Sequence, residues 1–432
     1  MTDINADTLP ENILGEGMVW RAIPSDRYKT SKIRITLTMP MEAEHASDRA
    51  AAIKLLSRSC EEYPTRTAMK KQLAMLYGAS INGSVSRHGD QQQLWLEVTT
   101  LSDRFSLERI SLSMQCTDLL CRVLMRPALE NGLFPAAEVE MEKRLLREQL
   151  ESQRNDKLMY SLDRCLEETF KGQPAGLDPL GTMETIDAIT PESVTAAWRD
   201  LLSRARICVI AVGDMDFRAV RGLLSQALSG IERHYSPIAA NTSIERRGSV
   251  NEVIEPADAV QSKMCLSFSL PEPDDFNYIA QMFSRCLGGD TSSRLFNTVR
   301  EQLSLCYYCG STYSRSKNCM LIYSGLETGK LEEAKEEILR QCRWIADGKL
   351  TEEEITAARL SYANSCAMAG ESAGSLIAWY SSLLPEYDIS PEQAARMAAE
   401  VTPEQIAALA AQMELDTVYI LRGDAQGQED AQ

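Results

Sequence analysis

One order of predicted elements occurs twice along the chain, and this duplication constrains the fold more than any other feature. In each half, strand-like alternation precedes two helical segments, two further strands and a group of amphipathic helices, because apolar residues recur with period 2 in strands and 3.6 in helices. The peptide GSVSR at residues 83–87 is echoed by GSTYSR at residues 310–315, which supports an internal repeat. The predicted elements are residues 19–38 (two antiparallel strands around the turn Ser25-Asp26), 43–60, 68–77, 81–86, 93–100 and 104–153 in the first half, and 264–270, 278–287, 292–303, 309–312, 320–326, 331–346 and 352–368 in the second.

These elements predict an α+β (α/β) protein with two homologous domains, each an antiparallel β-sheet packed with helices, arranged as an open clamshell. A chain of 432 residues is too long for a single hydrophobic core. The mixed polar stretch 232–257 has few periodic apolar residues and therefore predicts a linker. The predicted organisation is a polar N-terminal segment (1–12), a first domain (13–231), the linker (232–257), a second domain (258–422) and a polar tail (423–432).

The charge of the chain argues against nucleic-acid partners. A net charge of −17 and a pI near 4.9 would repel a polyanion. No apolar run approaches the roughly 18 residues of a membrane span, and residues 1–12 have neither the cationic start nor the apolar stretch of a secretory signal. We therefore expect a cytoplasmic protein with no membrane or nucleic-acid partner, which binds proteins, peptides or small molecules.

Cysteine and histidine usage argues against disulfide, redox and autonomous metal sites. Twelve cysteines are scattered through a chain for which no secretory signal is expected, so mostly buried free thiols are predicted. The closest pair, Cys306 and Cys309, follows a helical run and enters a strand, whereas a redox pair needs a helix N-terminus to lower the thiolate pKa. The histidines, His45, His88 and His234, lie far apart in sequence, and we expect no zinc site from them.

Arg300 and Tyr307 are the candidate binding residues. They follow the pair Gly288-Gly289 and a helical run, which predicts a guanidinium at the end of a helix and a phenol at the start of the next strand. Both groups donate hydrogen bonds and could hold a peptide carbonyl. The structural alternative is an ion pair between Arg300 and Glu301, with Tyr307 as an aromatic side chain at the edge of the core.

Several motifs together resemble the pitrilysin/insulinase family of zinc metallopeptidases. The resemblance covers roughly residues 19–422 and includes both halves of the chain. It is carried by G-G-x-x-S-S-R-L-F at residues 288–296, V-R-E at 299–301, L-x-Y at 305–307 and L-T-E-E-E at 350–354, and in the first half by L-Y-G-A at 76–79, E-K at 142–143, D-P-L-G at 178–181 and V-G-D at 212–214.

The resemblance implies a zinc site that this chain lacks. In the family, an inverted His-x-x-Glu-His helix supplies two imidazole ligands and a general base, and a distant Glu supplies the third ligand. The corresponding segment reads Lys54-Leu-Leu-Ser57-Arg58, in which two cations one turn apart would repel a dication. Glu148 matches the distant Glu, and we expect it to be solvated or paired with a cation such as Arg58. No metal ion or other cofactor is therefore expected in this chain.

The resemblance also implies a function for the remaining pair. In zinc-bearing relatives, residues at the positions of Arg300 and Tyr307 hold the substrate backbone and stabilise the developing oxyanion. Some family members divide the labour between a zinc-bearing subunit and a paralogue that keeps only this pair. We therefore predict a non-catalytic subunit of a heterodimeric zinc peptidase, whose partners are a zinc-bearing paralogous subunit and an extended peptide substrate. The alternatives are a peptidase-fold scaffold with no role in hydrolysis and an autonomous peptidase.

Overall fold

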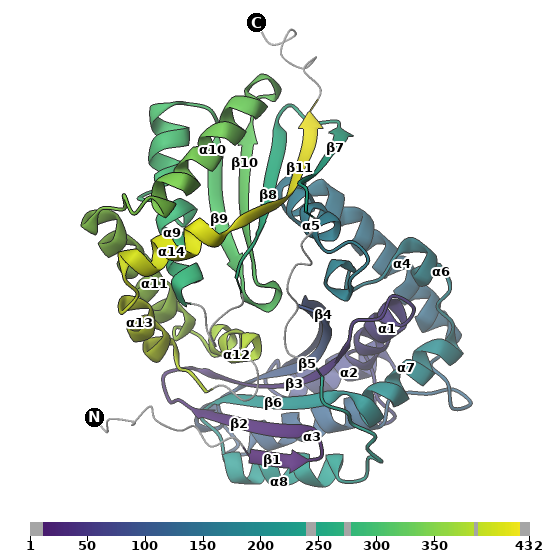
Figure 1. The fold of residues 1–432 in the computed structure, drawn as a ribbon. Coiled ribbons are helices and arrows are strands. Elements are labelled where there is room, and N and C mark those ends of the chain that lie inside the picture. Colours follow the sequence, from purple (N-terminus) through teal and green to yellow (C-terminus); the bar gives the residue numbers. More distant parts are fainter. Residues whose placement is uncertain (1–11, 239–247, 272–277, 384–387, 424–432) are drawn as a thin grey trace, which may run out of the picture. The chain divides into compact units, whose positions relative to one another are not determined.

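The computed structural model of the chain describes residues 12–238, 248–271, 278–383 and 388–423. Contacts divide the chain into two units, each with its own β-sheet and helices (Figure 1). Unit 1 comprises Met1–Leu150, Leu177–Ala240 and Met368–Ser390, and unit 2 comprises Glu151–Gly176, Asn241–Ala367 and Pro391–Gln432. Two sheets packed with helices confirm the predicted α+β class.

The sheet of unit 1 has six strands in the order β1-β2-β6-β3-β5-β4. β6 is parallel to β2 and antiparallel to β3, and the remaining neighbours are antiparallel. β2 and β3 run in opposite directions, as predicted for residues 19–38, but they are not paired, because β6 from much later in the chain lies between them. The strands are β1 (Asn12–Gly15), β2 (Met18–Pro24), β3 (Thr30–Pro40), β4 (Ser80–His88), β5 (Gln91–Leu101) and β6 (Arg206–Gly213).

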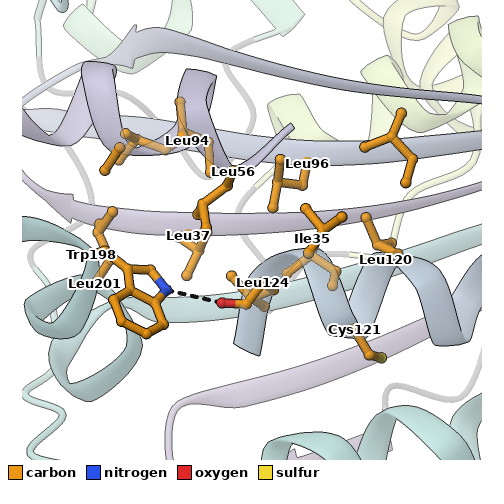
Figure 2. Packing of buried hydrophobic residues seen from close by; sticks show 14 of the residues in the cluster. Ile35, Leu37, Leu56, Leu94, Leu96, Leu120, Cys121, Leu124, Trp198 and Leu201 are labelled. Carbon is orange, nitrogen blue, oxygen red and sulfur yellow. Dashed lines mark hydrogen bonds between the residues drawn. The ribbon is translucent and has the colours of Figure 1, made fainter. Parts of the chain in front are cut away.

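Apolar residues alternate along β3 and β5 and face the helices of unit 1. Ile35 and Leu37 of β3 and Leu94 of β5 are fully buried in this core (Figure 2). The indole nitrogen of Trp198 closes one side of it with a 2.9 Å hydrogen bond to the carbonyl of Leu124 (Figure 2). The helices of unit 1, with α4 reaching just past its boundary, are α1 (Ala46–Leu56), α2 (Arg66–Met75), α3 (Leu112–Met125), α4 (Ala136–Ser152), α6 (Met183–Asp187), α7 (Pro191–Arg204), α8 (Phe217–Leu228) and α12 (Ala373–Ser382).

The sheet of unit 2 repeats this topology in the order β7-β11-β8-β10-β9. β11 is parallel to β7 and antiparallel to β8, and the remaining neighbours are antiparallel. β7, β11, β8, β10 and β9 therefore correspond to β2, β6, β3, β5 and β4. The two similar peptides identified in the sequence lie on corresponding strands, with Gly83 in β4 and Gly310 in β9. A residue with left-handed backbone conformation precedes each glycine by the same number of positions: Tyr77 (φ 56°) and Ser304 (φ 51°). The strands are β7 (Asn251–Ala257), β8 (Ser262–Ser269), β9 (Tyr308–Ser314), β10 (Cys319–Leu326) and β11 (Glu414–Gly423).

The helices of unit 2 follow the predicted segments closely. α9 (Tyr278–Gly288), α10 (Leu331–Ala346) and α11 (Glu352–Ala369) lie where the periodicity predicts helices. Residues 292–303 are also largely helical, but they form a π-helix, η4 (Leu295–Gln302), a rare geometry that is often found at functional sites. The others are α5 (Lys157–Thr169), α13 (Pro391–Ala399) and α14 (Pro403–Gln412). Among the described helices, none has both the length and the apolarity needed to cross a membrane.

Each half of the chain contributes one helix to the unit formed mainly by the other half. α5, from the first half, packs on β8 and β11 of unit 2, where the hydroxyls of Tyr160 and Tyr419 each donate a 2.7 Å hydrogen bond to Glu255. α12, from the second half, packs on β3 and β6 of unit 1. Because β8 and β11 correspond to β3 and β6, the two helices occupy corresponding places. The predicted domains 13–231 and 258–422 are continuous stretches of sequence, whereas each unit of the structure combines separate stretches of the chain.

The predicted terminal and linker segments lie partly outside the described residues. These parts are residues 1–11, 239–247 and 424–432. The end of the predicted linker is corrected by the structure, because Asn251–Ala257 form β7. β7 is an edge strand whose outer positions are exposed and include Glu252, Ile254 and Pro256, so its alternation of apolar and polar residues is weak and the strand is not apparent in the sequence.

Candidate functional site

The residues that the sequence analysis assigns to the zinc-motif positions lie at the C-terminal end of α1. Lys54 is in the last helical turn, and the Ser57 hydroxyl donates a 2.8 Å hydrogen bond to the Lys54 carbonyl. Arg58 follows the helix, and its guanidinium forms an ion pair with the carboxylate of Glu142 on α4. The Arg58 side chain is 17% exposed and that of Glu142 is 2% exposed, so the pair is largely shielded from water.

Burial dominates the electrostatics of this ion pair. It raises the pKa of Glu142, against the positive charges of Arg58 and Lys54, and it lowers the pKa of Arg58. A guanidinium nevertheless stays protonated in proteins, so Arg58 provides the countercharge of the buried carboxylate. Arg66 of α2 forms a second ion pair, at 3.1 Å, with Glu138, which lies on α4 one turn before Glu142.

The residues at these positions do not fit a zinc ion. Zinc takes thiolate, imidazole and carboxylate ligands, whereas an ammonium, a hydroxyl and a guanidinium stand at positions 54, 57 and 58. No cluster of three or more His, Cys, Asp and Glu side chains that could hold a metal ion occurs in the part of the chain that the structure describes. We therefore assign no step through a metal ion to this chain.

Glu148 lies outside the buried ion pair. Its carboxylate is exposed and stands 3.6 Å from the guanidinium of Arg144, one turn earlier on α4. Glu148 follows Glu142 by six positions, so the two side chains project from different faces of the helix. The buried face carries Val139, Glu142 and Leu146. This spacing of three and four residues is the sequence signal that identifies Glu142, because it places a carboxylate within an apolar stripe.

Arg300 and Tyr307 line one surface pocket of unit 2, with a volume of about 450 Å³, which we call the donor pocket. Arg300 stands in the last turn of the π-helix η4. The chain then turns through the left-handed residue Ser304 (φ 51°), and the Tyr307 amide donates a 2.8 Å hydrogen bond to the Gly325 carbonyl just before β9 begins. This turn brings both side chains to one pocket. The other residues that line it are Glu301, Ser304, Leu305, Cys306, Glu327 and Lys330.

Both donor side chains are accessible. Arg300 is 40% exposed, and its guanidinium lies 4.6 Å from the centre of the Phe296 ring and 3.4 Å from the Glu301 carboxylate. Tyr307 is 47% exposed, and its hydroxyl donates a 3.3 Å hydrogen bond to Glu327. Desolvation and the charge of Glu327 raise the pKa of Tyr307, so the phenol keeps its proton at neutral pH. Exposed ion pairs contribute little to stability, so both side chains can exchange these contacts for those of a ligand.

Comparison with known proteins finds relatives over nearly the whole chain. Residues 188–362 match the family described as Peptidase M16 inactive domain. The chain is 25% identical over 410 residues to the probable inactive metalloprotease YmfF of Bacillus subtilis, which covers 94% of this chain and 96% of that protein. It is 26% identical over 262 residues to an uncharacterized zinc protease of Rickettsia felis, which covers 57% of this chain and 60% of that protein.

Solved structures share the fold over its full length. A conserved protein from Enterococcus faecalis V583 superposes with a TM-score of 0.87 at 24% identity, covering 97% of this chain and 99% of that chain. A peptidase M16 inactive domain from Pseudomonas fluorescens superposes with a TM-score of 0.77 at 14% identity, covering 96% and 98%. At such identities the likeness establishes the fold and not the activity.

These matches confirm the resemblance to the pitrilysin/insulinase family of M16 metallopeptidases. The family domain and the Bacillus subtilis relative are both described as inactive, which agrees with the expectation that Lys54, Ser57 and Arg58 stand in place of the zinc motif.

Proposed function

We propose that the chain is the non-catalytic subunit of a heterodimeric zinc peptidase, in which a zinc-bearing paralogous subunit supplies the metal ion, the water and the general base. This chain would hold the peptide through Arg300 and Tyr307. The observation that carries the proposal is that these two side chains, both exposed, line the same donor pocket.

The chemistry of the donor pocket suits a peptide carbonyl. A guanidinium and a protonated phenol both donate hydrogen bonds to an oxygen, and such donors stabilise the negative charge that develops on a carbonyl oxygen during hydrolysis. The pair therefore supports substrate binding and transition-state stabilisation. The general base and the metal would come from the partner.

The neighbouring strand supports an extended peptide as the ligand. β9 begins directly after Tyr307 and lies at the end of the strand order in unit 2. An edge strand can pair with an added peptide strand through its backbone groups. An extended substrate could thus gain backbone hydrogen bonds from β9 while its carbonyl meets Arg300 and Tyr307.

The experiment mixes this chain with a zinc-bearing paralogue of similar length from the same genome and measures peptide cleavage. Arg300→Ala and Tyr307→Phe should each lower kcat/KM by about 100-fold, the effect of losing one transition-state donor. Complex formation, followed by size-exclusion chromatography, should not change. Arg343→Ala, which removes an exposed arginine of α10 that does not line the pocket, is the matched control.

The alternative function is a peptidase-fold scaffold that binds a partner without contributing to hydrolysis. The ion pair of Arg300 with Glu301 is the contact expected for a residue with only a structural role. A scaffold predicts that the partner's cleavage rate is the same with either donor variant as with the wild-type chain. That result, with an intact complex, would exclude the subunit role proposed for Arg300 and Tyr307.

A further inference from the structure

The ring of Phe296 lies beside Arg300 on the π-helix η4. Phe296 precedes Arg300 by four positions, and the guanidinium carbon of Arg300 is 4.6 Å from the centre of the Phe296 ring. Phe296 is half-buried and is not among the residues that line the donor pocket. The ring therefore contacts Arg300 from outside the pocket, and it would act on a bound peptide only through that side chain.

The contact with the ring leaves hydrogen-bond donors of Arg300 available. An aromatic ring attracts a guanidinium through its quadrupole and offers no oxygen acceptor, whereas a guanidinium carries five N–H donors. The ion pair of Arg300 with Glu301 is 3.4 Å long and exposed. A peptide carbonyl can therefore take the place of Glu301 while the contact between Arg300 and the Phe296 ring stays.

The ring also restricts the Arg300 side chain before a peptide arrives. A long side chain such as arginine loses conformational entropy when it is fixed in one arrangement. If the folded chain has already fixed it, the peptide does not have to, so binding and transition-state stabilisation are both more favourable.

The helix that carries both side chains is fixed at its start by Arg294. This guanidinium donates a 2.8 Å hydrogen bond to the side chain of Gln341 on α10 and a 2.7 Å hydrogen bond to Glu354 on α11. Leu295 and Val299 are buried on the inner face of η4. These contacts hold the helix against two neighbouring helices, so Phe296 and Arg300 stand on a fixed support.

The wide turn at the end of η4 contributes to the direction of Arg300. The Leu303 amide donates a 3.0 Å hydrogen bond to the carbonyl of Thr298, five residues earlier, which is the π-helical pattern. An α-helix would bond to the residue four positions back. Side chains in this turn therefore project in other directions than they would on an α-helix of the same sequence.

We propose that Phe296 is a positioning residue of the donor pocket, whose ring holds the Arg300 guanidinium in place for a peptide carbonyl before the peptide binds. This inference rests on the function proposed above for Arg300. It adds to that function a residue that acts on the substrate without contacting it.

Peptide cleavage by the complex with the zinc-bearing paralogue tests the positioning role. Phe296→Leu should lower kcat/KM about two- to fivefold, as expected for the loss of an exposed cation–π contact, and the loss should divide between kcat and KM as it does for Arg300→Ala. Phe296→Tyr keeps a ring at this place and should keep the wild-type kcat/KM. In the Arg300→Ala background, Phe296→Leu should have no further effect, because the ring acts only through Arg300.

Phe105→Leu is the matched control. Phe105 of unit 1 is 41% exposed, and the centre of its ring is 4.8 Å from the guanidinium carbon of Arg104. The variant therefore removes the same kind of contact from residues that do not line the donor pocket, and it should leave kcat/KM unchanged.

The isolated chain provides a second measurement, which needs neither the partner nor a substrate. In a chain made with isotope-labelled arginine, the Nε–H resonance of Arg300 is identified by its loss in Arg300→Ala. Phe296→Leu should shift this resonance, because the ring current of Phe296 is removed, and Phe105→Leu should not. A resonance that does not move in Phe296→Leu would show that the ring does not hold Arg300 and would overturn the proposal.

The kinetic outcomes separate this inference from the function on which it rests. If Arg300→Ala lowers kcat/KM but Phe296→Leu does not, or if Phe296→Leu lowers it equally in the wild-type and Arg300→Ala backgrounds, only the positioning role is overturned. If Arg300→Ala itself leaves kcat/KM unchanged, the proposed function is overturned, and the positioning role with it.

Discussion

We predict that Arg58→Met destabilises unit 1, because it leaves the carboxylate of Glu142 buried without a countercharge. The Glu142 side chain is 2% exposed and that of Arg58 is 17% exposed. Breaking a buried ion pair from one side costs about 3–5 kcal/mol, and the partial exposure of Arg58 favours the lower end, about 3 kcal/mol. With a shift in Tm of about 2–4 °C per kcal/mol for a unit of this size, Tm should fall by about 6–12 °C.

The loss should depend on pH in a defined direction. Burial raises the folded-state pKa of Glu142 above its ordinary value of 4.5, and the charge of Arg58 opposes this rise, so the pKa in the variant is higher still. A carboxyl whose folded-state pKa is raised contributes stability below its unfolded-state pKa, and this contribution is lost as the pH rises through the folded-state pKa. The difference between variant and wild type should therefore be largest at neutral pH and shrink as the pH falls toward 4.5.

Tryptophan fluorescence during thermal unfolding is the assay for unit 1. Four of the five tryptophans, at positions 20, 95, 198 and 379, belong to unit 1, and a Trp344→Phe background removes the fifth. The matched control is the double variant Arg58→Met with Glu142→Leu, which replaces both charges with apolar groups and should restore Tm to the wild-type value or above it. An unchanged Tm in Arg58→Met, or a loss that grows toward acid pH, would refute the role of Arg58 as countercharge.

Three further outcomes test the packing and the metal assignment. Glu255→Gln should destabilise unit 2 by about 1–2 kcal/mol at neutral pH, because a charged acceptor of two hydrogen bonds is lost. Burial acts to raise the pKa of Glu255, but hydrogen bonds from Tyr419 and Tyr160 hold it below 4.5. The stabilities of variant and wild type, measured by denaturation, should therefore converge as the pH falls below that value. Gly83→Ala should lower the stability of unit 1 by about 1–3 kcal/mol, because the added Cβ would lie 2.6 Å from the carbonyl oxygen of Ile53 and force β4 away from α1. The fluorescence assay for unit 1 measures this loss, and an unchanged Tm would count against the contact. Dialysis of the isolated chain against EDTA should leave its unfolding curve unchanged, and a loss of Tm that added zinc reverses would contradict the absence of a zinc site.

Local periodicity predicts the elements well and their long-range pairing poorly. The bounds of α10 coincide with the predicted segment 331–346, because its apolar residues form one buried face. The two strands of residues 19–38 read as a hairpin because a short polar turn joins them, yet β6 pairs with both. The exchange of α5 and α12 likewise depends on contacts between distant residues, such as Cys165 with the carbonyl of Cys265, 100 positions away. No local pattern encodes such a partner.

The candidate site shows the same division between local and distant information. The short spacing of Arg300 and Tyr307 leads to a shared pocket, because a tight turn through Ser304 connects them. The partner of Arg58 is Glu142 rather than Glu148. The apolar stripe of α4 places Glu142 on the buried face, but only the packing of α4 brings that carboxylate to Arg58.

The buried ion pair gives the cation at position 58 a structural role within unit 1. A buried carboxylate requires a positive partner, and Arg58 provides it. A single Arg58→His change would supply one imidazole, but at neutral pH it would largely remove that charge and, as for Arg58→Met, destabilise the unit. Arg300 and Tyr307 instead contact exposed groups at a pocket wall, so substitutions there test ligand binding with little effect on folding.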